Sequence, residues 1–225
     1  MTLEFDHLFI CTAIGAPEAD RLVQIGLTEG QSNSHPGQGS ACRRFFGYNA
    51  YLEFLWVQDK QAACRPPAAP LQLWERSQYR QSGHAPFGLG LRSTQQADPY
   101  PSLPFTTWAY RPPYLPPPLQ IEVAVDSIQP GVPLVFHFPG GKRPDHYPLE
   151  RQQPLVHGIR VQEITDIALT LPTQSLSCPL IQTLADAGLA RFIPGEGYRA
   201  DVTFDGGKQK QRVDCQPALP LVLHW

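Results

Sequence analysis

The chain has 225 residues, 42% of them apolar, and a formal charge of −2. A chain of this length forms one large domain or two small ones. Its weak net charge gives no electrostatic reason to expect nucleic acid or a membrane surface as a partner. No apolar run approaches the ~20 residues of a membrane span, and the acidic start Met1–Asp6 does not resemble a secretory leader. We therefore expect a cytoplasmic protein.

The first quarter of the chain predicts the element order β-α-β-β-β. Strands are expected at residues 3–12, 28–33, 41–48 and 50–58. Pro17 and the acidic residues after it favour the start of a short helix, and Gly26 favours its end. A glycine-containing loop separates the second strand from the third.

The 25 prolines concentrate between Pro66 and Pro154 and disfavour helices there. This middle part predicts strands at residues 87–92, 106–110, 119–125 and 133–138, joined by extended loops. It resembles the β-α-β-β-β order of the first quarter with the helix shortened or lost. The last part predicts a strand at 164–171, a helix at 178–187, and strands at 198–204, 211–216 and 221–225.

Two pairs of segments resemble each other and indicate repetition. The run Phe5–Thr12 parallels Thr165–Thr170, and Pro133–Phe138 parallels Pro220–Trp225 with a histidine in register. We interpret residues 1–150 as a pair of modules with a degenerate, proline-rich second member, and residues 151–225 as a third, partial module. The third module either completes the same fold or pairs across a homodimer.

The five cysteines are odd in number and far apart, so they predict neither a CxxC metal pair nor a disulfide framework. We expect reduced thiols. Cys11 and Cys42 lie in apolar runs and are interpreted as small buried hydrophobic side chains rather than reactive groups.

His7 and Glu53 are the most informative polar residues, because each lies inside an apolar predicted strand. A polar group in a buried strand is costly unless something binds it. If the two strands are neighbours, both side chains can converge on one metal ion. The alternative for His7 is a core histidine that is hydrogen-bonded to the backbone.

The first 60 residues resemble the glyoxalase-like branch of the vicinal oxygen chelate superfamily. The resemblance rests on Asp6–Ile10, the helix ending in Gly26-Leu27, the loop His35–Ser40, the strand Arg43–Phe46 and the strand Tyr51–Val57. It implies an α+β fold in which repeated βαβββ modules form curled mixed sheets around a cup-shaped site. It also implies a divalent metal in the cup, held by first-strand and fourth-strand residues, and substrates with two adjacent oxygens.

Carried over by position, His7 matches the first-strand ligand and Glu53 the fourth-strand ligand. The second module departs from the pattern, since its first strand offers only Gly88, Leu89 and Gly90, whereas its fourth strand offers His137. Two histidines and a carboxylate suit Fe, Mn, Ni or Zn. Glu53 serves either as a ligand or as the catalytic base.

Substrate-binding candidates are Arg43, Arg44 and His35. The adjacent arginines point to opposite faces of their strand, so one faces the cup and can clamp a carboxylate or phosphate. The parity of Phe46 and Tyr48 favours Arg44 weakly. His35 opens a loop that is either a structural turn or a gate for substrate.

The expected function is a glyoxalase-like or dioxygenase-like metal enzyme, a lyase, isomerase or dioxygenase, acting on a small oxygen-rich metabolite. The alternative is a non-catalytic small-ligand-binding protein on the same fold, with an aromatic lining from Phe45, Phe46, Tyr51 and Trp56. A third reading, in which Pro112–Pro118 docks a partner as polyproline II, is the weakest.

Overall fold

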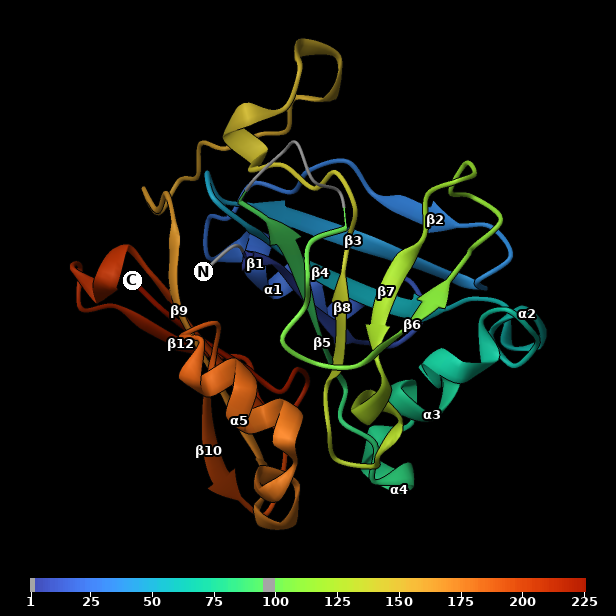
Figure 1. The fold of residues 1–225 in the computed structure, drawn as a ribbon. Helices are drawn as coiled ribbons and strands as arrows, with labels where there is room; N and C mark the ends of the chain where they lie inside the picture. The colour runs from blue at the N-terminus through green and yellow to red at the C-terminus, as the bar shows by residue number, and fades with distance from the viewer. Residues whose placement is uncertain (1–2, 95–99) are drawn as a thin grey trace.

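A computed structural model describes residues 3–94 and 100–225 of the chain. These residues form an eight-stranded curled sheet, a five-stranded sheet and a few short helices (Figure 1). The predicted α+β class, with repeated modules curling around a cup, is confirmed.

The first sheet contains the strands of residues 3–137. They are β1 (Leu3–Cys11), β2 (Asn33–His35), β3 (Ser40–Phe46), β4 (Tyr51–Val57), β5 (Phe87–Ser93), β6 (Thr107–Tyr110), β7 (Ile121–Ala124) and β8 (Leu134–His137). The short helices of this part are α1 (Asp20–Gln24), α2 (Lys60–Ala63), α3 (Leu73–Ser77) and α4 (Tyr79–Ser82).

The strand order of the first sheet is β2-β3-β4-β1-β5-β8-β7-β6. Strand β1 is parallel to β4 and antiparallel to β5, and β5 is parallel to β8. Each half therefore places its first strand at the centre beside its own fourth strand. This arrangement brings the strand that carries His7 next to the strand that carries Glu53.

The second sheet contains β9 (Ile164–Pro172), β10 (Arg191–Gly195), β11 (Arg199–Phe204), β12 (Arg212–Asp214) and β13 (Leu221–His224), and α5 (Pro179–Asp186) joins β9 to β10. Its order β10-β9-β11-β13-β12 reproduces the strand directions of β4-β1-β5-β8-β7. If Asp166 is matched to Asp6, Ile167 stands where the first sheet has His7. Phe192, which lies opposite Leu169, then stands where the first sheet has Glu53. The second sheet has thus replaced both polar residues with apolar ones.

One hydrophobic core joins the two sheets. It combines the outer, convex face of the first sheet with the apolar face of the second sheet and with α5. Its members include Leu8, Ile10, Phe54, Leu89, Val135, Ile167, Leu169, Leu180, Leu184, Val202 and Leu223. The division of the chain into a paired unit and a third module stays a prediction, since this core spans the boundary.

Three differences from the expected elements concern short segments. Strand β2 begins at Asn33 rather than Thr28, and β10 was not predicted. The proline-rich segment after β4 contains helices α2, α3 and α4, where only strands and loops were expected. The side chain of Asp59 caps α2 by accepting a hydrogen bond from the Ala62 N–H.

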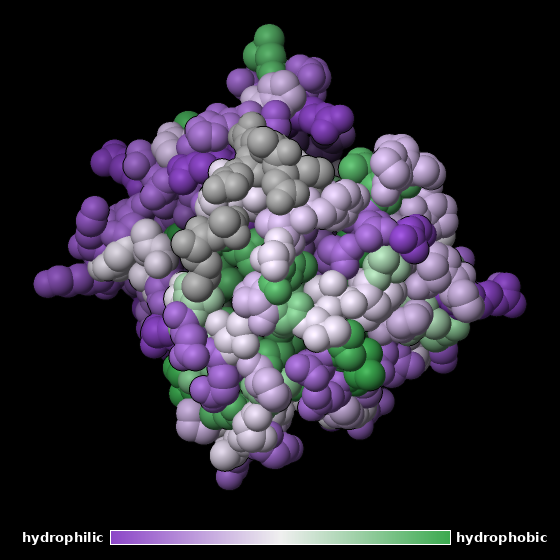
Figure 2. All heavy atoms as spheres, in the orientation of Figure 1, coloured by the Kyte–Doolittle hydropathy of each residue, from purple (hydrophilic) through white to green (hydrophobic). Residues whose placement is uncertain are grey.

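The surface in Figure 2 is mostly hydrophilic along its left and upper edges, with apolar side chains showing in its centre and lower part. Among residues 3–94 and 100–225, no helix has the length and apolarity needed to cross a membrane.

Candidate functional site

The concave face of the first sheet gathers most of the predicted site residues. Glu53 lies opposite Phe9 of β1 on one side and opposite Arg44 of β3 on the other. Because paired positions share a face and alternate residues do too, His7, Glu53 and Arg44 all face the cup. Cys42, two residues before Arg44, faces it as well.

The remainder of the cup is apolar and aromatic. A second hydrophobic cluster, separate from the main core, fills it between the sheet and the segment of α2 and α3. It includes Phe9, Cys11, Leu55, Val57, Leu71, Leu73, Tyr110, Val123 and Leu134. The polar residues therefore meet at the edge of an apolar interior, where charges interact more strongly than in water.

His7 is held rigidly in this cup. Its Nδ1 lies 2.7 Å from Oδ2 of Asp6, and Oδ1 of Asp6 accepts a 3.0 Å hydrogen bond from Arg92. The imidazole ring stacks on Tyr51 with ring centroids 4.5 Å apart. The Asp6 carboxylate makes Nδ1 the protonated nitrogen, so the lone pair of the neutral ring lies on Nε2. Within the described part of the chain, Nε2 has no hydrogen-bond partner.

Three side chains from adjacent strands form a compact donor cluster beside His7. One potential ligand atom from each of His35, Cys42 and Glu53 lies within 4.8 Å of the other two. Cys42 is fully buried, Glu53 is 6% exposed, and His35 is half-buried. Burial, followed by the nearby Glu53 charge, raises the pKa of the Cys42 thiol. Burial lowers the pKa of His35, which favours its neutral, ligating form.

A hydrogen-bond network fixes His35 and closes one side of the cup. Nδ1 of His35 lies 3.0 Å from Oγ of Ser40, which accepts a hydrogen bond from the Gln38 amide. The hydroxyls of Tyr110 and Tyr114 both donate to Oε1 of Gln38 at 3.0 Å. The loop after β2 is thereby tied to the segment after β6, across the mouth of the half-barrel.

The two adjacent arginines have different surroundings. Arg43 lies opposite Phe54, on the convex side, and makes a bidentate pair with Glu29 (2.7 and 2.6 Å) and a 2.7 Å bond to Asp20. Arg44 donates from Nε to the Gln31 carbonyl and lies over the Phe46 ring. No ion pair of Arg44 occurs among the described residues. Its two Nη groups are the ones suited to a ligand anion.

The family that the sequence resembles has four metal-ligand positions, and only two of them hold a possible ligand in this chain. His7 and Glu53 occupy the two positions of the first half. On the concave face of the second half, β5 presents Gly88 and Gly90, and the register places Leu134 and Phe136 of β8 beside them. The family's four-residue set therefore does not fit this chain.

The structure does not bring His137 to His7 and Glu53. His137 is fully buried and lies opposite Leu91, a residue of the main core. Strand alternation turns it toward the convex face, whereas its neighbour Phe136 faces the cup, 5.3 Å from the His7 ring. Its proposed part in a shared metal site has no geometric support here.

Two residues of the site were not recognised in the sequence. Cys42 was interpreted as a buried hydrophobic residue, although the parity that favours Arg44 also places Cys42 on the cup face. Asp6 was noted only as part of the opening motif. Asp6 orients His7 through a hydrogen bond between these two adjacent residues of β1. The contact forms where the pairing of β1 with β5 is irregular, between Phe5 and His7.

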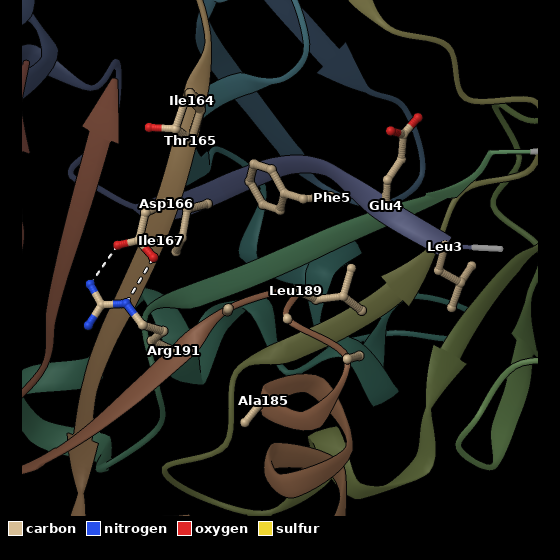
Figure 3. A pocket seen from close by; sticks show the side chains of 13 residues that line it. Leu3, Glu4, Phe5, Ile164, Thr165, Asp166, Ile167, Ala185, Leu189 and Arg191 are labelled. Atoms are coloured by element: carbon tan, nitrogen blue, oxygen red, sulfur yellow. Dashed lines mark hydrogen bonds and ion pairs between the residues drawn. The ribbon is translucent and has the colours of Figure 1, made fainter. Parts of the chain in front are cut away.

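A separate cavity of about 300 Å³ lies where the start of β1 meets β9, α5 and β10 (Figure 3). Its main charged groups pair with each other, since the Arg191 guanidinium binds the Asp166 carboxylate at 2.8 and 2.6 Å. Glu4, at its other side, pairs with Arg92. This cavity lacks the donor cluster of the cup.

Comparison with known proteins supports the fold alone. No protein-family model matches the sequence, and no curated protein matches it. A crystal structure of a hypothetical protein from Staphylococcus aureus is similar at a TM-score of 0.51 and 8% identity, covering 99% of each chain. A fusion protein of a xylose isomerase-like TIM barrel and 4-hydroxyphenylpyruvate dioxygenase gives a TM-score of 0.49 at 12% identity. That match covers 90% of this chain and 36% of the fusion protein, and its TM-score is too low to carry an argument.

Proposed function

We propose that this protein is a metal-dependent enzyme of the vicinal oxygen chelate type that acts on a small, oxygen-rich anionic metabolite. One observation carries the proposal. His7, His35, Glu53 and Arg44 come from four adjacent strands and meet on the concave face of the first sheet, at the edge of an apolar cup. Two buried and two half-buried polar side chains on one face of the sheet favour a functional role over a packing one.

The residues divide into binding and proton-transfer roles. Arg44 binds a carboxylate or phosphate of the substrate through its Nη groups. Nε2 of His7, on the side of the ring away from Asp6, is placed to accept or return a proton. Glu53, buried against the apolar interior, serves either as a metal ligand or as a second proton acceptor. A bound divalent metal would polarise a substrate oxygen.

A substrate screen tests the proposal. Wild-type protein loaded in turn with Zn²⁺, Fe²⁺, Mn²⁺ and Ni²⁺ is assayed with α-ketoaldehydes, α-keto acids and catechols. Turnover should fall by at least about tenfold in Glu53→Gln, a loss of about 1.4 kcal/mol of transition-state stabilisation. The exposed Glu150→Gln is the control and should retain activity. Equal turnover in both variants would place the chemistry elsewhere.

The alternative is a non-catalytic protein that holds a small apolar or aromatic ligand in the same cup. It is favoured by the missing second-half ligands and by the aromatic rings on this face: Tyr51 and Phe136 contact His7, and Phe9 stacks on Phe136. Of the expected aromatic lining, Phe46 and Tyr51 face the cup, whereas Phe45 and Trp56 pack in the main core. Native mass spectrometry of the purified protein separates the two functions. A co-purifying organic ligand without turnover would favour the binding protein.

A further inference from the structure

We propose that the metal centre of this protein is a thiolate site formed by His35, Cys42 and Glu53, and that His7 lies outside the coordination sphere. The centre would take a thiophilic divalent ion such as Zn²⁺ rather than Mg²⁺ or Ca²⁺. The inference rests on the proposed function for its role in catalysis, but metal binding itself is tested separately.

The backbone places the three donors close enough for one ion. Tetrahedral zinc binds N, O and S atoms at about 2.0–2.3 Å, which separates neighbouring ligand atoms by roughly 3.5 Å. The three atoms here lie within 4.8 Å of one another, so side-chain rotations that move atoms by about 1 Å complete the site. The pairings of Asn33 with Cys42 and of Arg44 with Glu53 hold the three strands in register.

The donor set selects the class of metal. One imidazole, one thiolate and one carboxylate match the ligands of zinc and of other borderline or soft ions, whereas Mg²⁺ and Ca²⁺ prefer oxygen alone. Three protein ligands leave a further position for water or substrate, as in catalytic zinc sites. The thiol proton of Cys42 leaves when the ion binds.

Hydrogen bonds around the cluster hold His35 in a fixed orientation, as expected for a metal ligand. Ser40 and Asn33 hold the two ring nitrogens of His35 at 3.0 and 3.2 Å, and an ion would replace one of these contacts. Ser40 is itself fixed by Gln38. Such second contacts orient ligating histidines in known metal sites.

His7 lies outside the donor cluster, and its packing fixes the ring in that position. The Asp6 carboxylate, the Tyr51 ring and the α-carbon of Gly90 hold the imidazole from three sides, and His7 is not part of the donor cluster. The second half of the cup offers only Gly88, Gly90, Leu134 and Phe136 at the family's remaining positions. The proposed ligands therefore lie on β2, β3 and β4, whereas the ligand positions of the family that the sequence resembles correspond to β1, β4, β5 and β8.

Cobalt substitution tests this assignment without any assay of activity. Wild-type protein titrated with Co²⁺ should bind one equivalent and develop the near-ultraviolet thiolate-to-cobalt charge-transfer band. Cys42→Ser should lose the band, and His35→Ala and Glu53→Gln should weaken Co²⁺ binding by at least about tenfold. Stoichiometric Zn²⁺ should abolish the band in wild type, and a large excess of Mg²⁺ should leave it.

Two other cysteines are matched controls. Cys11 is also buried on the concave face, on the far side of Leu55, and Cys64 is an exposed thiol. Cys11→Ser and Cys64→Ser should keep the band. If Cys42→Ser fails to fold, the variant in which Cys11, Cys64, Cys178 and Cys215 are all changed to Ser must retain the band on Cys42 alone. A missing band in wild type, its survival in Cys42→Ser, or its loss in Cys64→Ser would each overturn the assignment.

The outcomes separate this inference from the proposed function. A Cys42-dependent band without turnover of any substrate would support the thiolate centre and argue against the proposed enzymatic function. Metal-dependent turnover that is unchanged in Cys42→Ser would support the enzymatic function and contradict the thiolate centre.

Discussion

The imidazole ring of His7 lies directly against the α-carbon of Gly90 in the neighbouring strand β5. A β-carbon built at Gly90 would come within 2.4 Å of Cε1 and 2.5 Å of Nδ1 of His7. Gly90 is thus required for space, in a strand where glycine is otherwise unfavourable. The His7 ring therefore occupies the space that a ligand side chain at position 90 would need.

Gly90→Ala should therefore displace the His7 ring and lower the free energy of unfolding by about 1–3 kcal/mol, the usual cost of overpacking. Gly197→Ala is the control, because a β-carbon there meets no atom within 4 Å, and it should change stability by less than about 0.5 kcal/mol. Denaturant unfolding of the two variants measures the difference. Equal stability would show that the His7 ring is free to move.

Arg76 anchors the helical segment after β4 to the rest of the first sheet. It is fully buried and donates to the carbonyls of Leu71, Ala85, Ser127 and Val132, and burial lowers its pKa to about 10, so it stays charged at neutral pH. Arg76→Met leaves these carbonyls without their donor and should cost about 3 kcal/mol or more. Arg191→Met, which removes an ion pair from a 63% exposed side chain, should cost about 0–1 kcal/mol. Thermal unfolding of both variants checks the contrast.

Substitution of Arg43 should lower the stability of the fold, whereas substitution of Arg44 should weaken anion binding. Arg43→Met removes three charge-assisted bonds on the convex side and should destabilise the fold by about 1–3 kcal/mol. Arg44→Met should leave stability within about 1 kcal/mol of wild type. Oxalate, which carries adjacent anionic oxygens, should raise the melting temperature of wild type and Arg43→Met but not of Arg44→Met. An equal oxalate shift in all three proteins would remove Arg44 from the anion site.

His157 should make stability depend on pH. Its Nδ1 accepts the Thr28 N–H and its Nε2 donates to the Phe46 carbonyl, so the buried ring is neutral. Burial lowers its pKa below the ordinary 6.5 of the unfolded chain. Below pH 6.5 the unfolded state binds a proton that the folded state does not, so stability falls as the pH drops toward the folded pKa. Urea unfolding from pH 7.5 to 5 should show a smaller decline in His157→Gln, and an unchanged decline in the exposed control His146→Gln.

The sequence was sufficient to predict most of the fold. The order of strands in the first module follows from alternating apolar residues and from the turn residues between them. The match of Phe5–Thr12 to Thr165–Thr170 corresponds to β1 and β9, which hold equivalent places in their sheets. Short elements escaped prediction because their patterns are too brief. Strand β10, which contains Pro194, and helices α2 to α4, which lie among prolines, are stabilised by packing rather than by local preference.

The site was harder to predict because it depends on register. His7 and Glu53 could be placed in one cup from two neighbouring strands, but which face His137 occupies depends on where β8 pairs with β5. A shift of one residue exchanges the two faces of a strand. The nearness of Cys42 to His35 depends in the same way on the β2–β3 pairing, which spans a turn of only four residues.

The most direct test of the account is X-ray absorption spectroscopy at the zinc edge of protein loaded with one equivalent of Zn²⁺. The account predicts one sulfur ligand at about 2.3 Å together with nitrogen and oxygen ligands at about 2.0–2.2 Å, and loss of the sulfur contribution in Cys42→Ser. A first shell of nitrogen and oxygen alone in wild type would contradict it and would return His7 to consideration as a ligand beside Glu53.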